Sequence, residues 1–357
     1  QEEIYNPGQF GFVAPVWSPD SAWIAYSTNN LANMEQVYLY SLDKDEVFAI
    51  ADGLSDVGNP VFDRGGKYRY FFASTDAGPV RQWFAMSNAD MVMTRNLYLV
   101  TLQKGEPSPL AKESDEEPTG EPESDGEDET ESDESENPTV IDFEGLAQRI
   151  VSIPVDAGNY FDLQAGTENT VYYLAADPLA RGPNGSGTNL MSYDLGDREE
   201  KKLFAANAFE VSADGKKILY RKGSAWGIVD AGKKPEAGKG LLDMDGVTIR
   251  IDPAAEWAQI FDETWRIYRD YFYATNYHGA DWPAMRERYR PFVPDLACRS
   301  DLNRLIRWMG SELAVGHNRV GGGDYLFDAE EIPGGLLGAD YTIDNERYRF
   351  AKVYGGL

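Results

Sequence analysis

The first 245 residues repeat one pattern of hydrophobic and polar positions. In each copy, a turn rich in Pro, Asp, Asn or Gly precedes a run of alternating apolar and polar residues, and a loop then leads to a second such run. Alternation with a period of two predicts half-buried β-strands. The first alternating runs of the four copies are 21–27, 68–73, 170–175 and 217–220. The sequence therefore predicts four consecutive β-sheet units of similar construction.

The spacing of these copies predicts how the units assemble. The turn acids Asp20 and Asp63 lie 43 residues apart, and Glu168 and Asp214 lie 46 apart. Several short strands repeated every 40 to 50 residues or so are typical of β-propeller blades. We assign residues 1–242 to a partial propeller of four blades. Because four blades rarely close a ring alone, we expect further blades upstream.

A helical pattern begins at Asp252. An Asp followed by Pro253 is a strong helix-start signal, and the apolar residues after it fall on one stripe, which favours packing in a core. The stripe consists of Trp257, Ile260, Phe261, Trp265, Tyr268 and Phe272. Further helices are predicted to be capped by Asp281 and by Ser300. We assign residues 243–327 to this mainly α-helical domain.

Charge is concentrated in one segment of the chain. The 33 basic and 60 acidic residues give a formal net charge of -27, and 14 of the acids lie between Glu113 and Glu136, where there is no Lys or Arg. Such a segment buries too little apolar surface to offset the entropy lost on ordering. We predict a disordered insertion over 113–138, in a loop between the second and third blades. Its spacing matches no EF-hand loop; binding of a cation or a basic protein is the weaker hypothesis.

Composition also excludes several classes of function. A strongly acidic chain lacks the basic face that nucleic acid or an anionic membrane surface requires, so we expect neither partner. No stretch of about 20 apolar residues is present. The single cysteine, Cys298, excludes an internal disulfide framework and a cysteine-rich zinc site. We predict no cofactor and no metal. The chain starts at Gln1 and stops just after a strand-like run, so we expect a fragment.

Two histidines are candidates for chemistry. His278 lies among Asn, Gly and Asp residues, which favours a turn. His317 follows the third predicted helix, on a turn expected to lead into a short strand. An isolated histidine cannot hold zinc without partners, but it can serve as a general base. The residues alone leave His317 open between a structural and a catalytic role.

Several stretches resemble a known family. Segments 256–273, 278–282, 289–294, 299–302 and 311–317 resemble the C1 core domain of the tricorn group of serine peptidases (S41 type), and segment 17–26 resembles the WD40-like blades of tricorn and TolB proteins. The resemblance implies that His317 is the general base, with the serine nucleophile and the orienting acid beyond the end of this chain. The family often has a serine before this histidine. Here Gly316 removes that hydroxyl.

The C-terminal stretch 328–357 looks like the start of the PDZ domain that follows C1 in this family. Its carboxylate-binding turn would be Gly335, Leu336, Leu337 and Gly338. A glycine-rich loop before a strand is equally consistent with a plain turn.

The resemblance implies a peptidase that degrades oligopeptides entering through the propeller, forms a large homo-oligomer and is inactive as this chain alone. We expect it in the cytoplasm, with the periplasm as the alternative. No G-x-S-x-G elbow occurs, which disfavours a prolyl-oligopeptidase architecture. The competing interpretation is a non-enzymatic, TolB-like propeller that serves as a binding or scaffold protein.

Overall fold

The computed structural model describes residues 13–30, 34–51, 53–75, 94–111, 138–176, 187–323 and 337–355. The chain divides into two units, Gln1–Thr248 and Ile249–Leu357, each described by itself below. All but the last residue of the predicted insertion 113–138 lies outside the described residues, as do Gly335 and Leu336. The predicted domain boundaries after residues 242 and 327 remain predictions.

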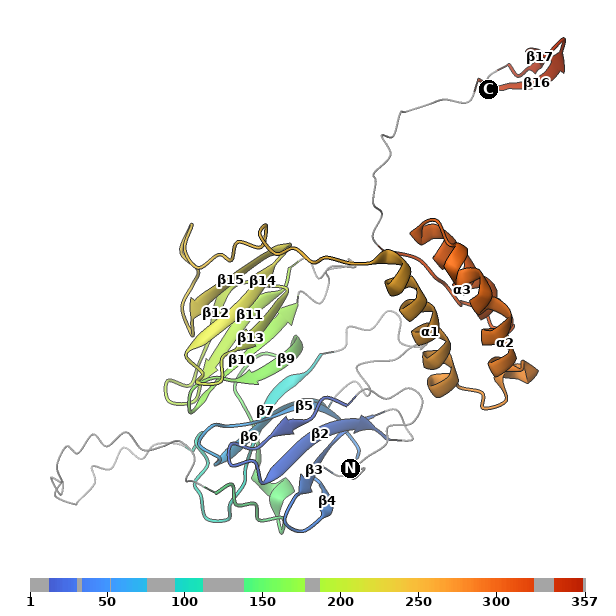
Figure 1. The fold of residues 1–357 in the computed structure, drawn as a ribbon. Helices are drawn as coiled ribbons and strands as arrows, with labels where there is room; N and C mark the ends of the chain where they lie inside the picture. The colour runs from blue at the N-terminus through green and yellow to red at the C-terminus, as the bar shows by residue number, and fades with distance from the viewer. Residues whose placement is uncertain are drawn as a thin grey trace, which may run out of the picture. The chain divides into compact units, whose positions relative to one another are not determined.

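The described residues of the first unit form four antiparallel sheets, each built from strands that are consecutive in the sequence (Figure 1). Blade one is β1 (Val16–Trp17), β2 (Trp23–Asn29), β3 (Glu35–Ser41) and β4 (Glu46–Ala49); blade two is β5 (Asp56–Phe62), β6 (Tyr68–Ser74), β7 (Asn96–Thr101) and β8 (Ile150–Ser152). Blade three is β9 (Asn159–Ala165), β10 (Thr170–Ala176), β11 (Asn189–Asp194) and β12 (Glu199–Ala205); blade four is β13 (Ala208–Val211), β14 (Lys217–Lys222) and β15 (Ala225–Asp230). The prediction of four propeller-type units is confirmed.

The position predicted for the acidic insertion is wrong. β8 pairs with β7 in the second sheet, after the short 3-10 helix Leu146–Arg149. The insertion therefore interrupts blade two between its third and fourth strands and does not join two blades. Three residues are too few to show an alternating pattern, so this strand was invisible in the sequence.

Apolar cores lie between neighbouring blades. One core contains Trp23, Leu39, Phe71 and Val100 from blades one and two. Equivalent cores join blades two and three, and blades three and four. The apolar faces of successive sheets are thus buried against each other, as expected for a propeller.

Turn acids add polar links between blades. The Asp63 carboxylate accepts hydrogen bonds from the backbone N–H groups of Gly65, at 2.9 Å, and of Asn169 in blade three, at 3.1 Å. Asp20 in blade one likewise accepts from the N–H of Thr139, at 2.6 Å. Each of these acids therefore fixes its own turn and ties it to the next blade.

The second unit contains the predicted helices. They are α1 (Pro253–Tyr271), α2 (Trp282–Tyr289) and α3 (Arg299–Ser311), with 3-10 helices η4 (Tyr277–Gly279) and η5 (Arg290–Asp295) on either side of α2. Asp252 and Asp281 cap α1 and α2 as predicted, and the predicted aromatic stripe packs in the helical core. Trp265 and Trp282 each donate an indole N–H to the other's backbone carbonyl, at 2.9 and 3.0 Å, which joins α1 to α2.

Two local predictions are wrong. The N-cap of α3 is Cys298, not Ser300, which lies within the first turn. The helix starts earlier because the Cys298 carbonyl already accepts the backbone N–H groups of Asp301 and Leu302, at 3.1 and 3.4 Å. The expected strand after His317 is also absent, since residues 318–323 are irregular.

The end of the described chain is a hairpin of β16 (Ala339–Asp344) and β17 (Arg347–Val353). Almost all of its side chains are exposed, including Tyr348 and Phe350. The strand pair agrees with the predicted β-rich end of the chain; its PDZ assignment remains a prediction.

Candidate active site

His317 lies on an exposed turn after the end of α3. The backbone has φ of +60° at His317 and +50° at Ala314. Both are left-handed conformations that residues other than glycine rarely adopt. The described residues provide no hydrogen-bond partner for the His317 ring, so neither a serine nor an orienting acid contacts it within this part of the chain. The His317 ring is therefore accessible to a hydrogen-bonding group that is not among the described residues.

Asn318, the next residue, is firmly anchored. Its Oδ1 accepts a hydrogen bond from the Tyr268 hydroxyl on α1, at 2.7 Å, and its Nδ2 donates to the Gly310 carbonyl on α3, at 2.9 Å. Burial raises the pKa of Tyr268, and the hydrogen bond to Asn318 partly opposes that rise. The sequence did not single out Asn318, because its side-chain partner Tyr268 lies 50 positions away along the chain.

His278 contacts the other end of the same turn. Its Nδ1 lies 2.9 Å from the Leu313 carbonyl oxygen, and its Nε2 lies 2.5 Å from the Tyr273 hydroxyl. A carbonyl can only accept, so Nδ1 carries the proton and, in a neutral ring, Nε2 accepts from the Tyr273 O–H. The predicted turn is confirmed, with φ of +55° at His278, and the ring adds a contact that the sequence did not predict.

Gly316 has room for a side chain. No described atom lies within 4 Å of the position that a Cβ would occupy, and the residue is not in the left-handed region. The missing serine hydroxyl is therefore not excluded by packing.

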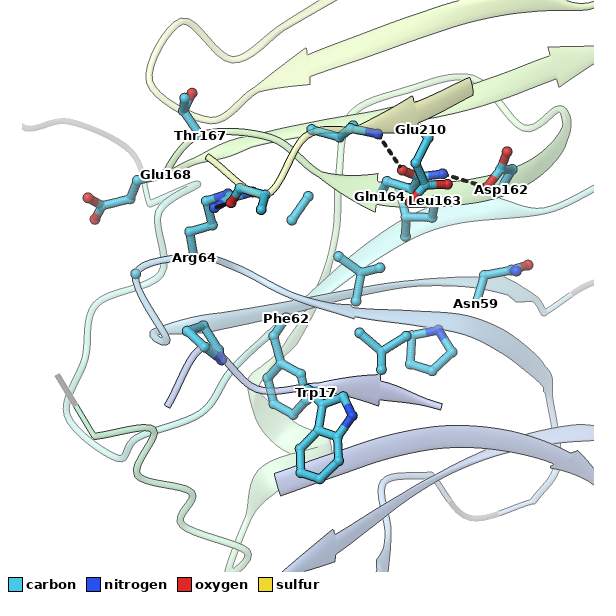
Figure 2. Close-up of a pocket in the computed structure, with 18 of the residues that line it drawn as sticks. Trp17, Asn59, Phe62, Arg64, Asp162, Leu163, Gln164, Thr167, Glu168 and Glu210 are labelled. Atoms are coloured by element: carbon cyan, nitrogen blue, oxygen red, sulfur yellow. Dashed lines mark hydrogen bonds between the residues drawn. The ribbon is translucent and has the colours of Figure 1, made fainter. Parts of the chain in front are cut away.

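A second candidate feature is a cavity of 1380 Å³ within the first unit. It is lined by the first strand of every blade, namely β1, β5, β9 and β13, and by the turns that follow them. Figure 2 shows Trp17 and Phe62 on the side of the first two blades, and Asp162, Gln164 and Glu210 on the side of the last two. Because first strands line the centre of a propeller, the cavity corresponds to its channel.

The cavity has a mixed lining, in which acidic side chains outnumber basic ones. The carboxylates are Asp162, Glu168, Glu210 and Asp214, and the cations are Arg64 and Lys216. Arg64 is already engaged, since its guanidinium donates to the carbonyls of Gly166, Ser212 and Ala213. Burial raises the pKa of Asp162, and the hydrogen bond from Gln164 works against this rise.

The predicted carboxylate-binding turn is only partly described. Leu337 is exposed and Gly338 has φ of +60°. The carbonyl of Gly338 accepts the Tyr354 N–H at 2.8 Å, which closes the open end of the hairpin. A peptide-binding role for this turn stays a prediction.

The described residues contain neither a metal-binding cluster nor a membrane-spanning helix. No cluster of three or more His, Cys, Asp or Glu side chains there could hold a metal ion. None of the helices there is both long and apolar enough to span a lipid bilayer.

Comparison with known proteins identifies the family. The tricorn protease second β-propeller domain matches residues 7–232, and the tricorn protease C1 domain matches residues 253–311. The fold and these matches define a multidomain protein in which propeller blades precede a helical core domain. The chain belongs to the tricorn protease family. This assignment favours the tricorn interpretation over the TolB-like alternative.

Individual relatives agree with this assignment. Tricorn protease homolog 1 from Streptomyces coelicolor is 31% identical over 92% of this chain and 31% of its own length. The tricorn protease of Thermoplasma acidophilum is 24% identical over 90% of this chain and 29% of its own length. A crystal structure of the tricorn protease superposes with a TM-score of 0.68 at 22% identity, covering 96% of this chain and 33% of that one. The chain therefore spans about a third of the length of these relatives.

Proposed function

We propose that this chain is part of an S41-type serine peptidase that degrades oligopeptides, with His317 as its general base. The observation that carries the proposal is the position of His317: it follows the C1 match by six residues and lies on an exposed, left-handed turn. Backbone conformations of this kind cluster at functional sites. The names of the matched relatives, which include tricorn protease, support the same activity.

The proposed chemistry is acyl transfer. His317 would take the proton from a serine hydroxyl as the oxygen attacks the peptide carbonyl, and would then donate that proton to the leaving amine. The serine and the acid that orients the imidazole are proposed to come from outside this chain. The exposure of His317 fits this arrangement, because a ring packed inside the helical unit could not reach such groups.

The propeller cavity is proposed to admit the peptide. Its volume of 1380 Å³ is large enough for several residues of an extended chain, and its lining mixes apolar and polar side chains. A PDZ-type module at 328–357, a homo-oligomeric assembly and a cytoplasmic location (or, alternatively, a periplasmic one) complete the proposal.

Fluorophosphonate labelling of the full-length protein tests the role of His317. General-base catalysis contributes about 10²- to 10⁴-fold, so His317→Ala should lower the labelling rate of the serine by at least about 100-fold. Arg319→Ala is the matched control, because Arg319 is exposed close to the same turn and has no assigned role. Normal labelling of a folded His317→Ala protein would contradict the proposed function.

A further inference from the structure

We propose that Asn318 and His278 are positioning residues for His317, which they serve by holding the two ends of the turn that carries it. The inference rests on the proposed function, since the position of the turn matters for catalysis only if His317 is the base. Neither residue is expected to touch substrate. Each would act through the backbone that fixes the direction of the His317 ring.

The first end of the turn is held at Leu313. The Leu313 side chain is fully buried in the helical core, while its carbonyl accepts the Nδ1–H of His278 at 2.9 Å. The Tyr273 hydroxyl, 2.5 Å from Nε2, fixes the orientation of that ring from its far side. Leu313 lies just past the C-cap of α3, so its carbonyl is outside the bonding pattern of the helix, and His278 supplies its partner.

The second end is held at Asn318. Both functional atoms of its amide are used, one on each of two helices: Tyr268 on α1 donates to Oδ1 and Gly310 on α3 accepts from Nδ2. The site is shaped for this amide, because a Cβ on Gly310 would lie 2.6 Å from Nδ2. No side chain other than hydrogen fits at position 310 without moving Asn318.

The four residues between these anchors carry two strained backbone conformations, at Ala314 and His317. A left-handed conformation costs about 1–2 kcal/mol for a residue other than glycine, and it persists only when the surroundings enforce it. His317 itself is exposed and makes no hydrogen bond to the described residues. Its ring direction is therefore set by the anchored backbone and not by contacts of the ring.

The test compares variants of the full-length protein by their saturation kinetics with a fluorophosphonate probe. Tyr268→Phe removes one hydroxyl that holds Asn318, and Asn318→Ala removes the whole amide. Tyr277→Phe is the matched control: the Tyr277 hydroxyl donates to the Arg269 carbonyl of α1, at 2.8 Å, and does not contact the turn. His278→Phe removes the contact to Leu313.

Small displacements of catalytic groups cost up to about 100-fold in rate. We therefore expect Tyr268→Phe, Asn318→Ala and His278→Phe to lower the maximal labelling rate per folded molecule by about 10- to 100-fold, with little change in the probe concentration at half saturation. Tyr277→Phe should stay within about twofold of wild type, because it keeps the packed ring and removes a hydroxyl that does not contact the turn. Combining Tyr268→Phe with Asn318→Ala should add no further loss, because the hydroxyl acts only through the amide.

The outcomes separate the two proposals. If His317→Ala abolishes labelling while Asn318→Ala and Tyr268→Phe label like Tyr277→Phe, the positioning role of Asn318 is refuted and the proposed function stands. The same result for His278→Phe refutes the role of His278. If His317→Ala labels normally, both are refuted. Should Asn318→Ala fail to fold, Tyr268→Phe still decides, since it removes a single oxygen atom.

Discussion

Arg69 on β6 carries a completely buried charge, and replacing it should stabilise the first unit. The side chain is completely buried, and none of its three guanidinium nitrogens has a hydrogen-bond partner in the described part of the chain. The guanidinium carbon lies 5.2 Å from the centre of the Phe62 ring. Burial lowers the pKa of Arg69 to about 9. The substitution Arg69→Met keeps an unbranched side chain and removes the charge.

The expected change in the free energy of unfolding follows from two opposing effects. A fall of the pKa from its usual value to about 9 means that burial disfavours the charged form by roughly 5 kcal/mol, at about 1.4 kcal/mol per pKa unit. The cation–π contact with Phe62 returns at most about 2 kcal/mol. Replacing a buried charged group by a well-packed apolar one is stabilising by about 1–4 kcal/mol in known cases. We expect Arg69→Met to raise the free energy of unfolding by about 1–3 kcal/mol.

Hydrogen exchange of peptides from β2, β6 and β7, measured on the whole chain, gives the local free energy of opening. Arg69→Lys is the matched control, because it retains an unpaired charge and should give no gain. The effect should also depend on pH. Above pH 9 folded Arg69 loses its proton while the unfolded chain keeps it, so wild-type stability rises and the advantage of Arg69→Met shrinks.

A loss of about 3 kcal/mol or more in Arg69→Met is what breaking a buried ion pair produces. That result would mean that the guanidinium has an anionic partner, and Arg69 would then not be an unpaired buried charge.

Three further variants test local features. Asp20→Ala should lower the free energy of unfolding by about 1.5–3 kcal/mol, because it removes hydrogen bonds to a charged carboxylate. Burial raises the pKa of Asp20, but the hydrogen bonds from Ser18, Thr139 and Ala22 outweigh this effect and lower the pKa. The stabilisation by Asp20 is present above pH 3.8, the usual pKa of an aspartate, and is lost as the pH falls through the lowered pKa of the folded protein. The destabilisation caused by Asp20→Ala, measured by unfolding in urea, should therefore shrink in acid. Ala314→Gly should raise the thermal midpoint, through about 1 kcal/mol of relieved left-handed strain; an unchanged midpoint would contradict the assigned φ. Gly316→Ser should keep the free energy of unfolding within about 0.5 kcal/mol, as expected for an open site, and should label no more slowly than wild type; a large loss of stability would show that the site is not open.

Much of the fold could be predicted because its signals are local. The alternation in β2 and β14 survives in the sequence, since one side of each strand faces a core. β6 and β10 stand out as apolar runs, because both sides of each strand face cores. The aromatic stripe of α1 and the caps Asp252 and Asp281 are equally local. The outer strands were missed for a physical reason: β4 and β8 are short, and β12 is mostly charged, so burial leaves little pattern in them.

The site was less accessible to prediction. His317 was found only through a family resemblance, and nothing near it in the sequence points to Tyr268, whose hydroxyl lies 50 positions before Asn318. The contact between His278 and Leu313 spans 35 positions and depends on how α1 and α3 pack. The propeller cavity is likewise lined by four strands that are distant in the sequence, and no single strand carries a pattern that predicts it.

The interruption of blade two has a consequence for how the propeller can be re-engineered. The connection from Thr101 to Ile150 has about 50 residues, and each doubling of a loop costs only about 0.6 kcal/mol of closure entropy. The chain that returns from it supplies Thr139, whose N–H and carbonyl bond Asp20 and the Trp23 indole of blade one. The segment from Thr139 to β8 therefore completes blade two and also binds it to blade one. New chain ends or a reporter domain introduced within residues 112–137 should thus be tolerated, because both sides of the break remain held by strand pairing and by these bonds.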